Sequence, residues 1–218
     1  MALVQQCLFP VEDVKVQKHQ NRKNHNQYFT PEFAVEKALS IVPDSKIENI
    51  IDPAVGNGVF LKIAAKKWTK VRLFGVDIDK EVIGKLKKST FQSASLFYGD
   101  ALLRETWQRN EFQSIISKGG FDLVVGNPPF SSWFHRIATS QILSNYKLAH
   151  RNGNLMRSQA VEILFLEIFI NLCRHNGFVI IVLPDGILSN PQYKYIRTFI
   201  LQETEVRYII SLPRNIFE

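Results

Sequence analysis

The sequence predicts an α/β fold in which a mostly parallel sheet is covered by helices on both faces. Three observations predict this fold. Short apolar runs of strand length alternate with longer stretches whose apolar residues repeat at helical spacing. Turn motifs rich in Gly, Asp and Pro follow several of the apolar runs. The chain has 218 residues and is 45% hydrophobic, which is enough for the buried core of one such domain.

The predicted elements follow one another in a regular order. Thr30 supplies an N-cap hydroxyl and Pro31 suits the first helical position, so we expect a helix to begin here. The remaining predicted elements are strand 47–51, helix 57–67, strand 71–76, helix 79–88, strand 95–98, strand 121–126, helix 158–175, strand 178–183, helix 191–203 and strand 206–211. Because parallel strands end at the same edge of a sheet, we expect a ligand at that edge.

The turn after strand 47–51 has the composition of a ligand-binding loop, with Asp52, Ala54, Gly56 and Gly58 in close succession. Glycine lets the backbone turn tightly and approach a ligand. Leucine stands where a dinucleotide fingerprint has its third glycine, and no Gly-Lys-Ser/Thr of a phosphate loop follows. A carboxylate at this position would also repel a pyrophosphate. The turn therefore favours a cationic ligand without phosphates, such as S-adenosylmethionine.

Two more acids follow the next two predicted strands. Asp77 lies where a carboxylate can accept both hydroxyls of a ribose, and Ile78 can cover an adenine face. Asp100, with Ala101 beside it, can accept the adenine amino group. Any one of these acids alone is better explained as a helix N-cap or a solvated loop residue. Acids at three successive strand ends favour a cofactor site.

A fourth strand end carries the turn Asn127-Pro128-Pro129-Phe130. The Asn127 amide and the Pro128 carbonyl are two acceptors on one stiff turn, so together they fit one NH2 group. Phe130 can lay its ring against the planar system that bears this amine. For these four residues alone, a turn that merely ends a strand explains the pattern equally well. The upstream acids favour an amine-methylating site.

These motifs together resemble those of S-adenosylmethionine-dependent DNA adenine-N6 methyltransferases, and most closely the methylation subunit of type I restriction-modification systems. Residues 27–31 resemble the family segment that closes over the methionine part of the cofactor, which implies Tyr28 and Thr30 as cofactor contacts. Segments 177–186 and 209–213 resemble later strands of the family. Phe217 resembles a second aromatic residue that stacks on the target base together with Phe130.

The resemblance implies a Rossmann-like methyltransferase fold with S-adenosylmethionine as cofactor and DNA as partner. It implies methyl transfer to the N6 amino group of adenine, with Asn127, Pro128 and Phe130 as the catalytic residues. We expect residues 1–26 to be a basic flexible lead-in and residues 27–218 to be the catalytic domain, truncated before the last antiparallel strand. We therefore expect sequence-specific activity to need a specificity subunit or a missing C-terminal recognition domain.

Three other interpretations remain open on the sequence. The nearest is methylation of a different amine, either guanine in ribosomal RNA or a glutamine side chain in a protein. A binding-only module of a larger complex is the second. A nucleotide-dependent oxidoreductase is the third, and both Leu61 and Asp52 disfavour it.

Composition agrees with an anionic partner and a reducing compartment. The net charge is +7, which favours nucleic acid. Cys7 and Cys173 lie far apart, and none of the five histidines has metal-ligand spacing, so we expect a cytoplasmic protein without a metal. The N-terminus has no signal-peptide pattern. The longest apolar stretch, residues 161–173, contains charges and is too short to span a membrane.

The periodic pattern loosens between Phe130 and Ser158, and loops of this length usually have a function or are disordered. The basic and aromatic residues of this stretch are Trp133, Phe134, Arg136, Tyr146, Lys147, His150, Arg151 and Arg157. They suit contacts with a nucleic-acid strand through phosphates and bases. An amphipathic lid helix whose aromatic residues face inward explains them equally well.

Overall fold

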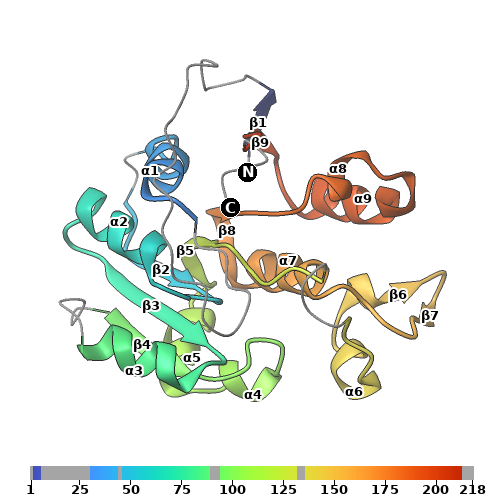
Figure 1. Cartoon of the computed structure of the whole chain (residues 1–218), viewed down its shortest axis with the longest axis horizontal. Helices are drawn as coiled ribbons and strands as arrows, with labels where there is room; N and C mark the ends of the chain where they lie inside the picture. The colour runs from blue at the N-terminus through green and yellow to red at the C-terminus, as the bar shows by residue number, and fades with distance from the viewer. Residues whose placement is uncertain (1, 6–29, 44–45, 89–93, 132–135, 213–218) are drawn as a thin grey trace, which may run out of the picture.

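The computed structural model describes residues 2–5, 30–43, 46–88, 94–131 and 136–212. Its centre is a five-stranded sheet in which all neighbouring strands are parallel, which confirms the predicted fold class. In spatial order the strands are β4 (Ala94–Tyr98), β3 (Arg72–Asp77), β2 (Asn49–Asp52), β5 (Phe121–Gly126) and β8 (Cys173–Ile181). The strand order reverses between β2 and β5 (Figure 1). Open α/β sheets bind ligands at such a switch point.

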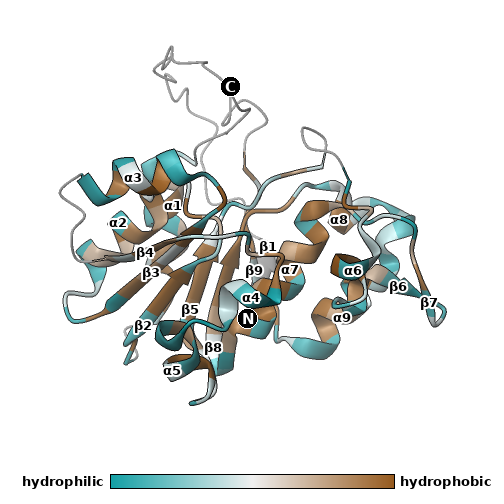
Figure 2. Cartoon of the chain, turned by 90° about the horizontal axis from the view of Figure 1, so that it is seen from below, coloured by the Kyte–Doolittle hydropathy of each residue, from teal (hydrophilic) through white to brown (hydrophobic). Residues whose placement is uncertain are grey.

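Helices cover both faces of the sheet. They are α1 (Glu32–Ser40), α2 (Val59–Lys67) and α3 (Lys80–Lys88) on one face and α5 (Asn110–Ile116) and α7 (Val161–Leu172) on the other. Ile50, Leu123 and Val125 pack toward the first group, whereas Ile51 and Val124 pack toward the second. Because strand side chains alternate between faces, these strands are apolar on both sides, as their colours in Figure 2 show.

The first helix begins one residue later than predicted, because Pro31 and not Thr30 is its N-cap residue. The carbonyl of Pro31 accepts hydrogen bonds from the backbone N–H groups of Ala34 and Val35. The Thr30 side chain caps nothing. It is 5% exposed, and its Oγ1 has no hydrogen-bond partner among the described residues.

The predicted helix 158–175 is shorter in the structure, since α7 ends at Leu172 and β8 begins directly at Cys173. Cys173 pairs with Phe121 of β5, and an irregularity in the ladder follows this pair. The two segments approach closely: a Cβ at Gly120 would lie 2.7 Å from the carbonyl oxygen of Leu172. Pairing with β5 therefore ends the helix before its apolar pattern ends.

The connections on either side of β5 contain short elements that the sequence pattern did not predict. They are α4 (Arg104–Trp107) and α5 before β5 and, after it, α6 (Ser140–Leu143), η1 (Lys147–Ala149), β6 (His150–Arg151) and β7 (Asn154–Leu155). An isolated bridge between Ile137 and Gln159 closes the base of the later insertion. Tyr146 is buried, and its hydroxyl donates a 2.7 Å hydrogen bond to the carbonyl of Leu102. This aromatic side chain therefore faces inward.

The last predicted helix and strand also differ from expectation. The predicted helix 191–203 follows α8 (Gly186–Ser189) and consists of η2 (Pro191–Tyr193) and α9 (Lys194–Glu203). The predicted strand 206–211 is reduced to β9 (Arg207–Ile209), which pairs in parallel with β1 (Ala2–Gln5) and not with the five-stranded sheet. Periodicity identified an extended segment here but could not identify its partner, which lies at the other end of the chain.

Candidate functional site

The glycine turn joins β2 to α2 at the carboxyl edge of the sheet. Gly56 and Gly58 have φ angles of 49° and 77°, in the left-handed region that favours glycine. The turn is fixed to the neighbouring strand, because the Val55 N–H donates a 2.9 Å hydrogen bond to the carbonyl of Val76. It also packs tightly on α3, since a Cβ at Gly58 would lie 3.1 Å from Leu86 Cδ2.

Asp77 holds this turn from the end of β3. Its Oδ2 accepts a 2.9 Å hydrogen bond from the Gly56 N–H, and its Oδ1 accepts one of 2.9 Å from the Asp79 N–H. The side chain is buried, and this burial raises its pKa above the ordinary value. Asp77 is therefore more than a predicted ribose ligand, because its carboxylate also fixes the shape of the cofactor turn.

Asp100 follows β4 beside Asp77. The Gly99 N–H donates a 3.0 Å hydrogen bond to the Asp77 carbonyl, which brings the ends of β3 and β4 together. One oxygen of the Asp100 carboxylate accepts from the Leu102 N–H at 2.9 Å, and the side chain is half-buried. Ala101 beside it is buried, whereas Ile78 is 66% exposed at the same edge. The structure thus groups these predicted cofactor residues, while their roles toward a ligand stay predictions.

Asp52 is the most deeply buried acid of the group, at 1% exposed. Its Oδ1 accepts a 3.0 Å hydrogen bond from the Ala54 N–H. Burial is the largest of the effects that together raise the pKa of this carboxyl to about 8; that hydrogen bond acts to lower the pKa and the nearby charge of Asp77 acts to raise it. No ion pair with Asp52 occurs among the described residues. A buried carboxyl without a cation is suited to a positively charged ligand.

The target turn lies directly against this acid. A Cβ at Gly126, the residue before Asn127, would lie 2.5 Å from Asp52 Oδ1, so only glycine leaves space for the carboxylate. Oδ1 of Asn127 is buried within the turn. Phe130 is only 8% exposed, so little of its ring is accessible for the predicted stacking with a base. The ends of β2 and β5 therefore bring the proposed cofactor turn and the proposed amine turn into contact.

Glu162 in α7 anchors the other end of the target turn, and the sequence analysis missed it. Its Oε2 accepts a 2.7 Å hydrogen bond from the Ser131 N–H, and its Oε1 accepts one of 2.9 Å from Ser131 Oγ. The carboxylate is 6% exposed. The available signal was an acid within the most apolar helix of the chain, because buried carboxylates are rare unless they have partners.

Two of the predicted site residues, Tyr28 and Phe217, lie outside the described residues, as do Trp133 and Phe134. Within the described ranges, no cluster of His, Cys, Asp and Glu could hold a metal ion. No helix in the same ranges is long and apolar enough to cross a membrane.

Residues 15–218 match the N-6 DNA methylase family, and the chain belongs to this family. The type II methyltransferase M.AccI of Acinetobacter calcoaceticus is 22% identical over 91% of this chain and 35% of its own length. The methylase subunit of the type I restriction enzyme MpnII of Mycoplasma pneumoniae is 23% identical over 89% of this chain and 38% of its own length. The family assignment made from the motifs is thus confirmed, and the chain spans well under half the length of these relatives.

Solved structures of low sequence identity share the fold. The methyltransferase subunit of a type I restriction-modification system from Streptococcus thermophilus superposes with a TM-score of 0.60 at 20% identity, covering 83% of this chain and 40% of that one. The modification subunit of a putative type I restriction enzyme from Vibrio vulnificus gives a TM-score of 0.58 at 19% identity, covering 80% of this chain and 38% of that one. These matches agree with the predicted Rossmann-like fold.

Replacing Asp52 by Asn should stabilise the protein increasingly as the pH rises. The native carboxyl keeps its proton up to about pH 8, whereas the unfolded carboxyl loses it near its ordinary value. The free energy of unfolding of the wild type therefore falls, relative to that of the variant, as the pH rises from the ordinary pKa of 3.8 to about 8. Urea unfolding at pH 5, 6 and 7.5 should show the Asp52→Asn advantage growing by up to about 1.4 kcal/mol per pH unit. A difference in unfolding free energy between Asp52→Asn and the wild type that stays the same at all three pH values would contradict this prediction.

Proposed function

We propose that the chain transfers a methyl group from S-adenosylmethionine to the N6 amino group of adenine in DNA. The observation that carries this proposal is the contact between Asp52 and Gly126, because it puts an acid suited to a cationic ligand beside a turn suited to an amine. Membership of the N-6 DNA methylase family supports it. Among curated relatives are methyltransferases of type I and type II restriction enzymes.

The residues at the strand ends fit this cofactor. S-adenosylmethionine supplies a methyl group on a positively charged sulfur, together with a ribose and an adenine. The buried Asp52 carboxyl would face the positive charge of the methionine part, and Thr30, with its buried hydroxyl, would help to close that end. Asp77 would accept from the ribose hydroxyls with the lone pairs that its backbone donors leave unused. Asp100 and Ile78 would contact the adenine.

The target turn would prepare the amine for methylation. The lone pair of an adenine N6 is delocalised into the ring, so the free amine is a poor nucleophile. Its two N–H groups would donate hydrogen bonds to Asn127 Oδ1 and the Pro128 carbonyl, and this favours a tetrahedral nitrogen with a localised lone pair. The new N–C bond forms as the S–C bond breaks, and the methylated nitrogen then releases one proton to water. No strong base is needed.

The target adenine must leave the DNA duplex to reach this turn, which costs a few kcal/mol. Phe217, by resemblance, would offset part of that cost by stacking on the flipped base, and Phe130 would add only the small part of its ring that is exposed. We further propose that the protein acts in a restriction-modification system and depends on a specificity subunit or recognition domain to select its site. The proposed reaction implies a location in the cytoplasm.

The decisive experiment uses labelled S-adenosylmethionine with DNA, RNA and protein fractions offered together. RNA is included because another relative, the ribosomal RNA small subunit methyltransferase A of Mesoplasma florum, is 27% identical over 72% of this chain and 54% of its own length. Label recovered as N6-methyladenine in DNA supports the proposal. Label recovered only in RNA or protein would overturn the proposed substrate.

Asp77→Asn should weaken S-adenosylmethionine binding about tenfold or more, since hydrogen bonds to a charged group contribute about 1.5–3 kcal/mol. The amide keeps the size of the side chain but has one acceptor oxygen in place of two. Asp79→Asn is a matched control two residues further on, because the Asp79 carboxylate accepts from the N–H of Glu81 in α3. Calorimetry that finds the same affinity in both variants would remove Asp77 from the site.

Asn127→Ala should reduce methyl transfer by at least about a hundredfold, the usual effect of losing one group that stabilises a transition state. Cofactor affinity should stay within about twofold of wild type, because the amide is proposed to bind only the amine. Asn145→Ala in the insertion, whose side chain bonds the Gln141 carbonyl, provides a control with the same substitution. Wild-type turnover by Asn127→Ala in the active assembly would refute the amine-binding role.

Glu162→Gln should lower turnover about ten- to a hundredfold without weakening cofactor binding, since small displacements of a reacting group have effects of this size. Glu167→Gln is the matched control, because the Glu167 carboxylate is buried in the same helix but accepts from the N–H groups of Lys147 and Leu148. Both variants should lower the melting temperature. Equal losses of turnover, measured at equal folded fractions, would show that Glu162 supports the fold only.

A further inference from the structure

A basic hollow of about 490 Å³ lies between the hairpin β6–β7 and the start of α9. Its volume is in the usual range of ligand-binding clefts. Both walls belong to connections that leave the carboxyl edge of the sheet, one after β5 and one after β8. In Figures 1 and 2 the hairpin and α9 lie at the end of the molecule opposite α3. We call this feature the β6–α9 hollow.

The walls of the β6–α9 hollow are held by hydrogen bonds. The hydroxyl of Tyr195 accepts from Gln159 Nε2 at 3.0 Å, and Gln159 is 1% exposed. Asn190 Oδ1 accepts from the Gln192 N–H at 2.9 Å, which shapes the segment before α9. On the hairpin side, His150 Nδ1 lies 2.9 Å from the Tyr146 carbonyl. The hollow is therefore formed before any ligand arrives.

Its chemistry is that of an anion site. Arg151 and Lys194 line it together with the neutral donors Asn152 and Gln192, and no carboxylate belongs to its described lining. The Arg151 guanidinium lies 5.7 Å from the centre of the Tyr195 ring, a cation–π contact that holds it in place. Two other cations of the described chain, Lys147 and Arg174, each form an ion pair with a carboxylate. The positive charge in the hollow is not neutralised in this way.

The hollow is also linked to the target turn through the start of α7. Gln159 holds Tyr195 in the wall of the hollow, and Glu162, three residues later, holds Ser131 at the end of the turn. Gln159 additionally pairs with Ile137 through two backbone hydrogen bonds, which ties down the insertion between them. The start of α7 therefore holds the hollow and the target turn in fixed positions relative to one another.

We propose that the β6–α9 hollow binds the phosphodiester backbone of DNA beside the flipped adenine, with Arg151 and Lys194 as the phosphate contacts. This inference rests on the proposed function for the identity of the ligand. Cations and amide donors without carboxylates suit phosphate oxygens, and the net charge of +7 favours the same partner. Such contacts fix the orientation of the duplex and carry no sequence information.

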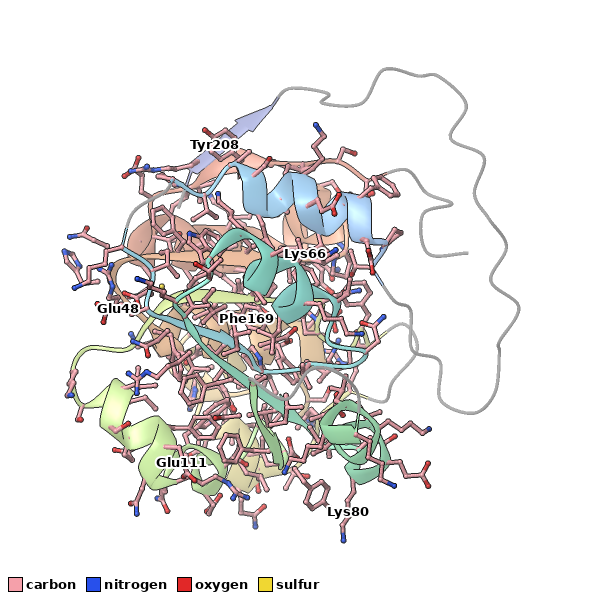
Figure 3. The ribbon with its side chains drawn as sticks, turned by 90° about the vertical axis from the view of Figure 1, so that its left-hand side faces the viewer. Glu48, Lys66, Lys80, Glu111, Phe169 and Tyr208 are labelled. Carbon is pink, nitrogen blue, oxygen red and sulfur yellow. The ribbon has the colours of Figure 1, made fainter. Side chains whose placement is uncertain are left out.

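The test compares two double variants of the full chain that remove the same charge. Arg151→Gln with Lys194→Gln changes the hollow. Lys66→Gln with Lys85→Gln is the matched control on α2 and α3, where both lysines are exposed and pair with surface acids. Figure 3 labels Lys66 between α1 and α2, in agreement with its pairing with Glu32 of α1. Binding of a labelled duplex is measured by fluorescence anisotropy over a series of salt concentrations, and S-adenosylmethionine binding by calorimetry.

The hollow variant should bind the duplex at least tenfold more weakly at low salt. The slope of log affinity against log salt should fall by about 1.8, as expected for two lost phosphate contacts. The control should change affinity less than about twofold, and all variants should keep wild-type cofactor affinity. Equal losses in both double variants, or an unchanged salt slope in the hollow variant, would overturn the proposal.

Two further outcomes separate this inference from others. If polyglutamate binds as tightly as DNA and loses affinity equally in the hollow variant, the hollow is a site for acidic peptides and the proposal fails. If the hollow variant loses DNA binding but the wild type in its active assembly, with its specificity subunit or recognition domain, methylates no DNA, the proposed function fails and the hollow stands. If the wild type methylates DNA but the hollow variant binds DNA as tightly as the wild type, the proposed function stands and the proposed phosphate site fails.

Discussion

The contact between the Asp52 carboxylate and the backbone of Gly126 fixes the geometry of the site. Asp52 ends β2 and Gly126 ends β5, which are neighbouring strands at the switch point of the sheet. A Cβ at position 126 would lie 2.5 Å from the carboxylate oxygen, so the acid and any larger residue exclude each other. The requirement for glycine therefore comes both from the neighbouring strand and from the backbone itself, because Gly126 has a φ of 153°, a conformation that L side chains rarely adopt. Because the strands are rigid, the contact would set how far the proposed target amine lies from the proposed cofactor.

Two buried aspartates show how this site differs from the rest of the fold. Asp52 lies at the carboxyl end of β2, and Asp122 lies near the amino end of the neighbouring strand β5. Burial acts to raise the pKa of Asp122, but hydrogen bonds from Arg174 and the N–H groups of Glu48 and Asn49 outweigh it and leave the pKa lowered. Among the residues that the structure describes, Asp52 has one backbone donor and no ion pair with a cation, and its pKa is raised to about 8. One acid thus stabilises the fold as an ion, whereas the other costs stability until a cation arrives.

Much of the architecture could be predicted because it depends on local pattern. The strands that end at Asp52, Asp77 and Gly126 are apolar on both faces, and their glycine and proline turns are local signals. Positions that depend on contacts distant in sequence could not be predicted. Examples are the early end of α7, set by pairing with Phe121, and the pairing of β9 with β1.

The site shows the same division between local and distant information. The acids at the strand ends and Asn127 carry motifs, so sequence reasoning found them. Glu162 has no motif, and its role depends on a hydrogen bond to Ser131, 31 residues earlier in the chain. The double role of Asp77 was also hidden, because its bond to the Gly56 N–H spans 21 residues. Residues proposed to contact a ligand could thus be identified from the sequence. Residues that position those ligand-contacting residues could not.

The first two turns of α7 connect these observations. Gln159 lies two residues before the helix, Glu162 in its first turn and Glu167 further along; each is buried, and each bonds a segment distant in sequence. Those segments are the wall of the β6–α9 hollow, the target turn and η1. Since a helix is stiff over this length, the three segments keep fixed positions relative to one another. A duplex held in the hollow would therefore meet the target turn in one orientation, which is what phosphate contacts contribute to a reaction on a single base.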